Sequence, residues 1–388
     1  MRARSKWFTV HRWLGIGLGV WFALVGLSGA VLVFEDPIDA WLNPRLLTSG
    51  ASGTHLSAQA IVARAEALYP LGLVEKIRFP ADDGEVYRLT LRVTARRVGA
   101  ERVEAMFEPS TAAFLGARSL DRLGVARPDV LRTLYEFHRN VLLGNAGSNI
   151  VGVAGLLLLT SAITGFVLAV PRTRAALKRI LWINPLASGT RIAYDFHRSS
   201  GIVFAITLLL ATLTGATLVY VKYVRDLVSV FSKVAPFPTV PWQTHTASEP
   251  LELDRVIADV RRRFPEHTLL EVHGSPRQMA GHLYYLRHAG DAHRQGDTIA
   301  WINPLSGEIV IERSPRTRTT GESFMHWLFP LHSGTAFGTV GQIAMAATGV
   351  VPALLVFTGF WVWLRKRRGE RISRERQILR DQANALVH

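Results

Sequence analysis

The chain has 388 residues, enough for two or three domains, and its 48% hydrophobic content and mean hydropathy of +0.18 are high for a soluble protein. It contains no cysteine, which excludes disulfides, iron–sulfur clusters, thiolate zinc sites and covalently attached c-type haem. The net charge of +15 would indicate nucleic-acid binding only if the basic residues formed one surface, so their positions matter.

Four apolar runs approach the ~20 residues that a helix needs to cross a bilayer. They lie at 14–34, 150–170, 201–221 and 340–364. The sequence therefore predicts an integral membrane α-helical protein with four transmembrane helices. The alternative for the first run is a cleaved signal peptide ending near Leu27-Ser-Gly-Ala30. Its length, and an internal repeat that pairs it with the third run, disfavour that alternative.

The basic residues gather in three short segments at one set of helix ends. Segments 1–13, 171–199 and 365–388 hold 18 of the 45 Lys and Arg but only 4 of the 30 acidic residues. By the positive-inside rule these segments, and both termini, are cytoplasmic. The long connections 35–149 and 222–339 are nearly neutral and are expected in the periplasm of a bacterial inner-membrane protein. The basic C-terminal segment is expected to attract anionic lipid rather than nucleic acid.

The first and third apolar runs repeat each other. An ungapped alignment, which we name the first alignment, places His11 to Gly15 (HRWLG) on His197 to Gly201 (HRSSG). Further along, it places Leu27 to Ala30 (LSGA) on Leu213 to Ala216 (LTGA).

The second and fourth runs repeat each other in a second ungapped alignment. It places Leu134 to His138 (LYEFH) on Leu328 to His332 (LFPLH), and Thr164-Gly-Phe166 on Thr358-Gly-Phe360. We therefore predict a duplicated two-helix unit with a pseudo-two-fold axis along the membrane normal.

The outer segments also correspond. Each has a helical pattern (57–69 and 253–264), short strands such as 87–93 and 283–287, and a closing hairpin. They predict two small periplasmic α+β domains. The expected order begins with the cytoplasmic start and first helix (1–34), the first outer domain (35–137), the second helix (138–170) and a cytoplasmic loop (171–200). It continues with the third helix (201–221), the second outer domain (222–325), the fourth helix (326–364) and the basic tail (365–388).

Four histidines form two symmetric layers. His11 and His197 lie at the cytoplasmic ends of helices one and three, and His138 and His332 near the periplasmic ends of helices two and four. Two facing imidazoles are the ligand set of haem b, and glycines along the helices would admit a porphyrin. The pattern predicts two haem b groups that carry electrons across the membrane. The alternatives are histidines that contact lipid headgroups and glycines that serve ordinary helix packing.

Further histidines lie outside this symmetry. His326 aligns with Arg132, and it is interpreted as an alternative axial ligand, a group on the substrate side or a surface residue. Five more in the second outer segment lack the spacing of a zinc site. They are expected to be solvated or to form a weak metal-binding surface: His267, His273, His282, His288 and His293.

The HRWLG, LYEFH, LFPLHSG, ITGF and FTGF segments, with a Pro-Leu-Ser-Gly hairpin, resemble those of PepSY-associated transmembrane proteins. The chain is similar to iron-regulated inner-membrane reductases that act on ferric siderophores. The resemblance implies PepSY-like outer domains and a di-haem reductase that reduces siderophore iron in the periplasm, where ferrous iron is bound less tightly and is released. It assigns the haem-ligand role to His11, His197, His138 and His332. The first hairpin departs from the pattern, because Glu108-Pro-Ser-Thr-Ala112 lacks a glycine equivalent to Gly307.

No flavin or nicotinamide fingerprint is present, so the electron donor must be external, either quinol or a cytoplasmic reductase. The expected partners are the lipid bilayer, that donor and a ferric siderophore, with no nucleic acid. An alternative is a non-enzymatic module whose outer domains bind a partner protein or a siderophore. A cation transporter would need intramembrane Asp or Glu, which the four apolar runs lack.

Overall fold

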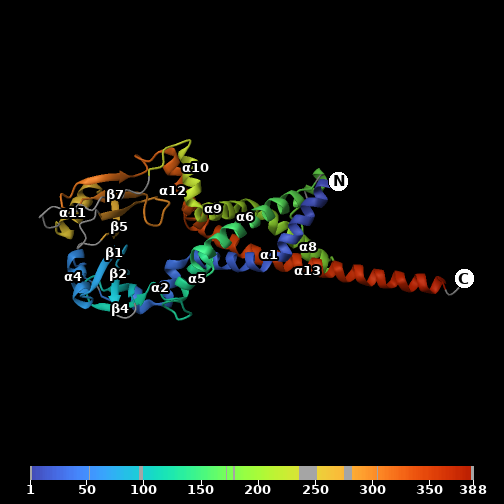
Figure 1. Cartoon of the computed structure of the whole chain (residues 1–388), viewed down its shortest axis with the longest axis horizontal. Helices are drawn as coiled ribbons and strands as arrows, with labels where there is room; N and C mark the ends of the chain where they lie inside the picture. The colour runs from blue at the N-terminus through green and yellow to red at the C-terminus, as the bar shows by residue number, and fades with distance from the viewer. Residues whose placement is uncertain are drawn as a thin grey trace. The chain divides into compact units, whose positions relative to one another are not determined.

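The structure is a computed structural model that describes residues 2–51, 53–95, 99–171, 173–177, 180–235, 251–274, 282–303 and 305–385. The chain divides into two compact units, between which it passes four times (Figure 1). We name them the helical unit (Met1–Val33, Phe137–Tyr220 and Gln342–His388) and the sheet unit (Phe34–Glu136 and Val221–Gly341).

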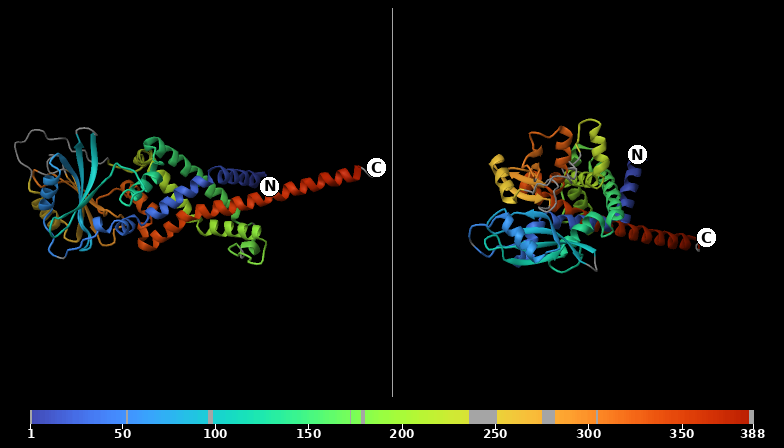
Figure 2. Two further views of the ribbon diagram at one scale, coloured as in Figure 1. Left: turned by 90° about the horizontal axis from the view of Figure 1, so that it is seen from below. Right: turned by 60° about the vertical axis from the view of Figure 1, so that its left-hand side comes forward.

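The helical unit holds the apolar runs. Its helices are α1 (Arg2–Leu32), α6 (Gly144–Ala169), α7 (Arg174–Leu177), α8 (Gly189–Val203), α9 (Ala205–Val219) and α13 (Gly338–Ala385). Figure 2 shows α13 as one long helix that continues past its apolar run. Among the described residues three helices are long and apolar enough to cross a membrane. A fourth span exists only if α8 and α9, which meet at a 62° bend, count as one.

The bend corrects one expectation. The third apolar run, 201–221, was expected to form one helix, but the helix is broken at Phe204. The segment that carries His197 therefore runs in a different direction from the apolar segment that follows it. The break occurs at a phenylalanine rather than at a helix-breaking glycine or proline. The structure offers no local physical reason for it.

Glycines bring the helices of this unit into close contact. A Cβ atom on Gly26 of α1 would lie 2.4 Å from the carbonyl oxygen of Gly349 in α13. A Cβ atom on Gly152 of α6 would lie 2.8 Å from the ring of Tyr220. These glycines serve helix packing, in agreement with the simpler of the two interpretations made from the sequence.

The sheet unit contains one antiparallel eight-stranded sheet with the order β4-β3-β2-β1-β5-β6-β7-β8. Its strands are β1 (Gly72–Arg78), β2 (Tyr87–Ala95), β3 (Gly99–Phe107), β4 (Phe114–Ser119), β5 (His267–His273), β6 (His282–His288), β7 (Thr298–Ile302) and β8 (Ile309–Arg313). The central pair joins two four-stranded meanders and places Ile77 opposite Val272. The two outer domains expected from the sequence are thus two lobes of one sheet.

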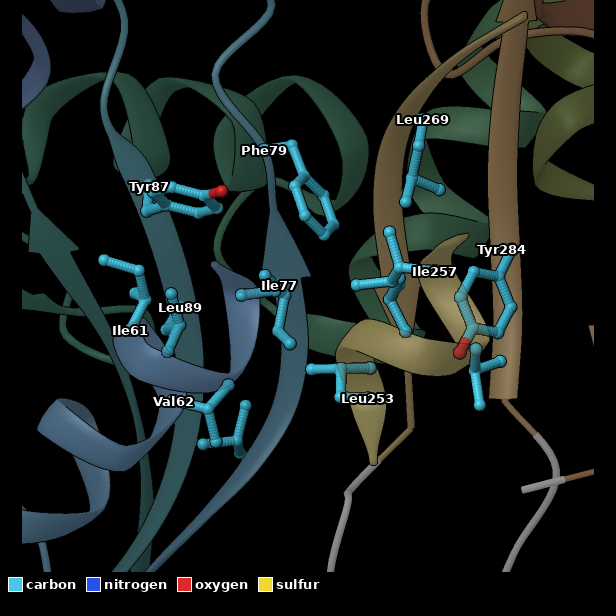
Figure 3. Packing of buried hydrophobic residues seen from close by; sticks show 14 of the residues in the cluster. Ile61, Val62, Ile77, Phe79, Tyr87, Leu89, Leu253, Ile257, Leu269 and Tyr284 are labelled. Atoms are coloured by element: carbon cyan, nitrogen blue, oxygen red, sulfur yellow. The ribbon is translucent and has the colours of Figure 1, made fainter. Parts of the chain in front are cut away.

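One hydrophobic core unites the lobes. Helix α4 (Ala58–Leu68) buries positions 58, 61, 62 and 65, and α11 (Leu253–Arg263) buries positions 253, 256, 257 and 260. Both sets have the i, i+3, i+4, i+7 spacing of an amphipathic helix. Figure 3 shows Ile61 and Leu89 from the first lobe in the same cluster as Ile257 and Tyr284 from the second. Because the core is shared, we expect the lobes to unfold together.

Helix α2 (Glu35–Leu42), which leads into α3 (Pro44–Leu47), is fixed to the sheet by a buried ionic network. Both guanidinium NH groups of Arg118 donate to the Asp39 carboxylate at 2.8 and 2.9 Å, and Arg118 also pairs with Glu104. Burial alone would raise the pKa of Glu104, but Arg88 and Arg118 lower it to about 2. The Glu104 carboxylate is therefore ionised at neutral pH.

The remaining helices are α5 (Val130–Asn140), α10 (Val221–Ser229), α12 (Thr320–Ser333) and the short 3-10 helix η1 (Thr335–Phe337). Helix α12 begins with a capping box formed by Thr319 and Glu322 and ends at Gly334 in the left-handed conformation, with φ of 82°.

The closing hairpins of the lobes have matching turns. Gly307 has φ of 72° and donates its N–H to Asn303 O, and Ala112 has φ of 54° and donates to Glu108 O. The first hairpin keeps the turn without glycine and places an alanine in the left-handed region, where an L-residue costs roughly 1–2 kcal/mol.

Candidate functional site

The structure brings His11 of α1 and His197 of α8 together inside the helical unit. Their ring centroids are 6.1 Å apart and the ring planes are inclined by 81°. A metal–imidazole bond is ~2 Å long and the bonded nitrogen lies ~1 Å from the ring centre, so two imidazoles on opposite sides of one ion have centroids ~6 Å apart. The observed separation therefore suits one metal ion held between the two rings.

Hydrogen bonds orient both rings. The Nδ1 atom of His11 is 3.0 Å from the carbonyl oxygen of Ser161, and that of His197 is 2.9 Å from the carbonyl oxygen of Leu355. The hydroxyl of Thr358 lies 3.1 Å from His197 Nδ1. A carbonyl oxygen can only accept, so each Nδ1 carries the proton and each Nε2 keeps a lone pair for a metal. This is the usual second hydrogen bond of a metal-ligating histidine.

His138, in the part of α5 that belongs to the helical unit, is held in the same way. Its Nδ1 atom lies 3.0 Å from the carbonyl oxygen of Val25 and 3.1 Å from the hydroxyl of Ser28, both in α1. His332 lies in α12 of the sheet unit. Its pairing with His138 therefore stays a prediction.

The contacts of His11 and His197 follow the two sequence alignments. The first alignment pairs the two histidines, and the second alignment pairs their carbonyl acceptors, Ser161 and Leu355. In each half, the first helix presents the imidazole and the second helix orients it. The hydrogen bonds of the two histidines thus follow the alignments, and the duplication itself stays a prediction.

A hydroxyl residue lies near each of the three rings: Ser28 near His138, Thr164 near His11 and Thr358 near His197. The glycine that directly follows each of these residues makes room for the ring. A Cβ atom on Gly29 would lie 2.8 Å from Cε1 of His138, and one on Gly165 would lie 2.8 Å from Cε1 of His11. A Cβ atom on Gly359 would lie 3.1 Å from Cε1 of His197. Sequence reasoning missed these residues as supports. The signal was a Ser/Thr–Gly dipeptide that recurs in every apolar run: Ser28-Gly29, Thr164-Gly165, Thr214-Gly215 and Thr358-Gly359.

Two further glycines border open space beside the pair. Gly15 and Gly201 lie one helical turn after His11 and His197. A Cβ atom on Gly15 would meet nothing within 4 Å, and one on Gly201 would come no closer than 3.8 Å to another atom, Leu355 Cδ2. Among the described residues, no atom lies close to these two positions, as a macrocycle at this place would require.

His326 has a different environment. Its Nε2 atom lies 2.6 Å from Asp297 Oδ1, and its side chain is only 15% exposed. The Nε2 atom is therefore engaged by a carboxylate and is not free to bind iron, and the ring is only partly exposed. The ring of His293 lies 5.2 Å from that of His326, and its Nδ1 accepts the N–H of Gln295. Burial and the neighbouring His326 lower the pKa of His293 to about 4.

The other histidines of the second lobe lie in separate side-chain contacts. In the parts of the chain that the structure describes, no three His, Asp or Glu side chains are placed to hold a metal ion. His273 pairs with Glu271 at 2.7 Å, and the rings of His267 and His288 lie 5.4 Å apart. His282 is buried, so the expectation that all five are solvated is wrong for this residue.

The family comparison covers both units. The model of the PepSY-associated TM region matches residues 8–366. The chain belongs to this family. None of the curated proteins matches the sequence. As a PepSY-associated TM protein with several apolar helices, the chain is a multi-pass membrane protein, and the match includes His11, His138, His197 and His332.

Proposed function

We propose that this protein is a di-haem inner-membrane reductase that passes electrons to a ferric siderophore in the periplasm and so releases the iron. The observation that carries the proposal is the His11–His197 pair, with centroids 6.1 Å apart and both Nδ1 atoms held by carbonyl oxygens. A second haem between His138 and His332 is proposed from the duplication. Both termini are cytoplasmic in this proposal, because the short basic segments lie at those helix ends.

Haem b, when bound, supplies a one-electron couple. The chain's own residues hold and orient it. His11 and His197 offer Nε2, the carbonyl groups of Ser161 and Leu355 fix the rings and increase their basicity through Nδ1–H, and Gly15 leaves space beside them. The donor is external, either quinol or a cytoplasmic reductase, because the sequence has no nucleotide fingerprint.

The test is an absorbance spectrum of the full-length protein in detergent, before and after dithionite. We expect a reducible b-type spectrum with two haems per chain. His197→Ala should remove one haem, and His138→Ala should remove the other. A colourless wild-type protein, purified from haem-replete cells, would overturn the proposal.

The alternative is a non-enzymatic membrane module that binds a partner protein or a siderophore. One observation favours it: an edge-to-face contact between two imidazoles at 6.1 Å stabilises a helix bundle without a metal. This alternative expects a colourless protein in which His197→Phe keeps iron uptake at the wild-type level.

A further inference from the structure

Arg12 of α1 directly follows His11 and has an unused hydrogen-bond donor. Its Nε atom is buried, and no acceptor among the described residues lies within hydrogen-bond distance of it. The guanidinium carbon is 5.6 Å from the ring centroid of Phe8 and 5.5 Å from that of Trp13. A buried donor without an acceptor is destabilising and therefore requires an explanation.

The repeat offers a matched residue for comparison. Arg198 is the counterpart of Arg12 in the first alignment and also follows a histidine of the pair. Its Nε donates to Ile180 O at 3.1 Å, its NH2 donates to Trp182 O at 3.1 Å, and it lies 3.4 Å from the carboxylate of Asp195. The protein itself thus satisfies Arg198.

The acidic partner is missing at the first position. Asp195 is 2% exposed and aligns with Thr9, whose hydroxyl donates to Ser5 O. The two halves hold their histidines alike, but within the described part of the chain only the second half supplies an acid for its arginine. The free N–H of Arg12 is therefore a local departure from the symmetry.

The chemistry of the site indicates a planar carboxylate. A guanidinium group presents a rigid fork of N–H donors that matches a carboxylate. The Cα–Cβ bond of a helical residue tilts towards the helix N-terminus, which directs Arg12 to the cytoplasmic side in the proposed topology. Haem b carries two propionate carboxylates at one edge of its ring, and it would lie beside His11.

We propose that Arg12 binds a propionate of the haem that His11 and His197 hold. The inference rests on the proposed function. Arg198 does not bind the second propionate, because its N–H groups are used by the 180–182 segment. The two propionates are therefore held unequally.

The experiment compares haem b with its dimethyl ester, in which both propionates are blocked. The haem-free full-length His138→Ala variant, which keeps only the His11–His197 site, is titrated with each compound in detergent while the bis-histidine spectrum is recorded. We expect haem b to bind ~10-fold more tightly than the ester, because the ester cannot accept a charge-assisted hydrogen bond. Adding Arg12→Gln should remove this preference and leave ester binding unchanged.

Arg198→Gln in the same background is the matched control and should keep the preference. Arg12→Lys should keep part of it, since the charge remains. The ester reports whether each variant still folds around the histidine pair. If neither compound gives a bis-histidine spectrum, both this inference and the proposed function are overturned. If haem binds but Arg12→Gln keeps the preference for haem over the ester, only this inference is overturned. The same holds if Arg12→Gln weakens the binding of haem and ester equally, which is expected for an arginine that contacts lipid phosphate.

Discussion

Two pairs of neighbouring histidines differ in what their nitrogens can do. The rings of His11 and His197 lie 6.1 Å apart in the helical unit, and those of His293 and His326 lie 5.2 Å apart in the sheet unit. In the first pair each Nδ1 is bound to a carbonyl oxygen, so each Nε2 is available to a metal. In the second pair the Nε2 of His326 is bound to Asp297. Ring separation alone does not identify a metal site, because the partner of each nitrogen decides which lone pair is free.

The largest difference in haem content should appear between variants that lack one histidine of each pair. We expect His11→Ala to abolish one of the two proposed haems, because that site would lose one of its two axial ligands. His326→Ala should leave both proposed haems in place, because the Nε2 of His326 is held by Asp297. Pyridine haemochrome analysis of the purified proteins measures the stoichiometry, and a haem lost with His326→Ala would break the distinction between the pairs.

The glycines beside the first pair give the next largest effect. In Gly165→Ala the new methyl group would lie 2.8 Å from the His11 ring and displace it. Overpacking of this kind costs roughly 1–3 kcal/mol, so haem should bind at that site ~5- to 150-fold more weakly in a spectroscopic titration. Gly155→Ala in the same helix is the control, because its Cβ would lie 3.9 Å from Ala216. Equal haem affinity in both variants would contradict the role given to Gly165.

The His293–His326 pair should affect the pH dependence of stability rather than haem binding. His293 has a folded pKa of about 4 against 6.5 for the free side chain, so the unfolded chain binds more protons between these values. The stabilisation is complete above pH 6.5 and is lost as the pH falls towards 4. Between pH 7 and pH 5 the opening free energy of the sheet unit should fall by about 2 kcal/mol.

Hydrogen exchange of β5 to β7 in the full-length protein, corrected for intrinsic rates, measures this change. Replacement of His293 by Gln should remove most of the dependence above pH 5. Glu104 and Glu271 have folded pKa values of about 2 against 4.5 for the free side chain. Their contributions are lost mainly below pH 4.5, outside this window. A slope that persists in His293→Gln would mean that another group titrates.

The smallest effect is expected from a single hydroxyl. Thr358→Val removes the hydroxyl 3.1 Å from His197 Nδ1 but keeps the carbonyl acceptor of Leu355. The loss of one neutral hydrogen bond is worth about 1 kcal/mol, so haem should bind about five-fold more weakly. A complete loss of haem would show that the hydroxyl, rather than the carbonyl group, orients the ring. Thr348→Val in the same helix is the control, because Thr348 bonds to Thr207.

Much of the site could be predicted from the sequence, because its parts recur at a fixed spacing in each alignment. The two alignments identified His11, His138, His197 and His332 as equivalent pairs, and the structure places His11 against His197. Their supports were not assigned, although Ser28-Gly29 and Thr164-Gly165 were visible as repeated dipeptides. A carbonyl acceptor such as that of Leu355 leaves no trace in side-chain identity, so sequence reasoning had no means to find it.

The sequence by itself determined the apolar runs, one helix and one strand of each lobe, and the repeated histidine motifs, because hydropathy and periodicity are properties of short segments. Only the tertiary structure decided that the two outer segments share one sheet and one core, that the third run bends at Phe204, and that His326 binds Asp297. The physical reason for the shared sheet, the shared core and the His326–Asp297 contact is that they depend on packing and pairing between segments far apart in the chain. The residues that a segment packs against come from distant parts of the chain, and many different sequences could provide them.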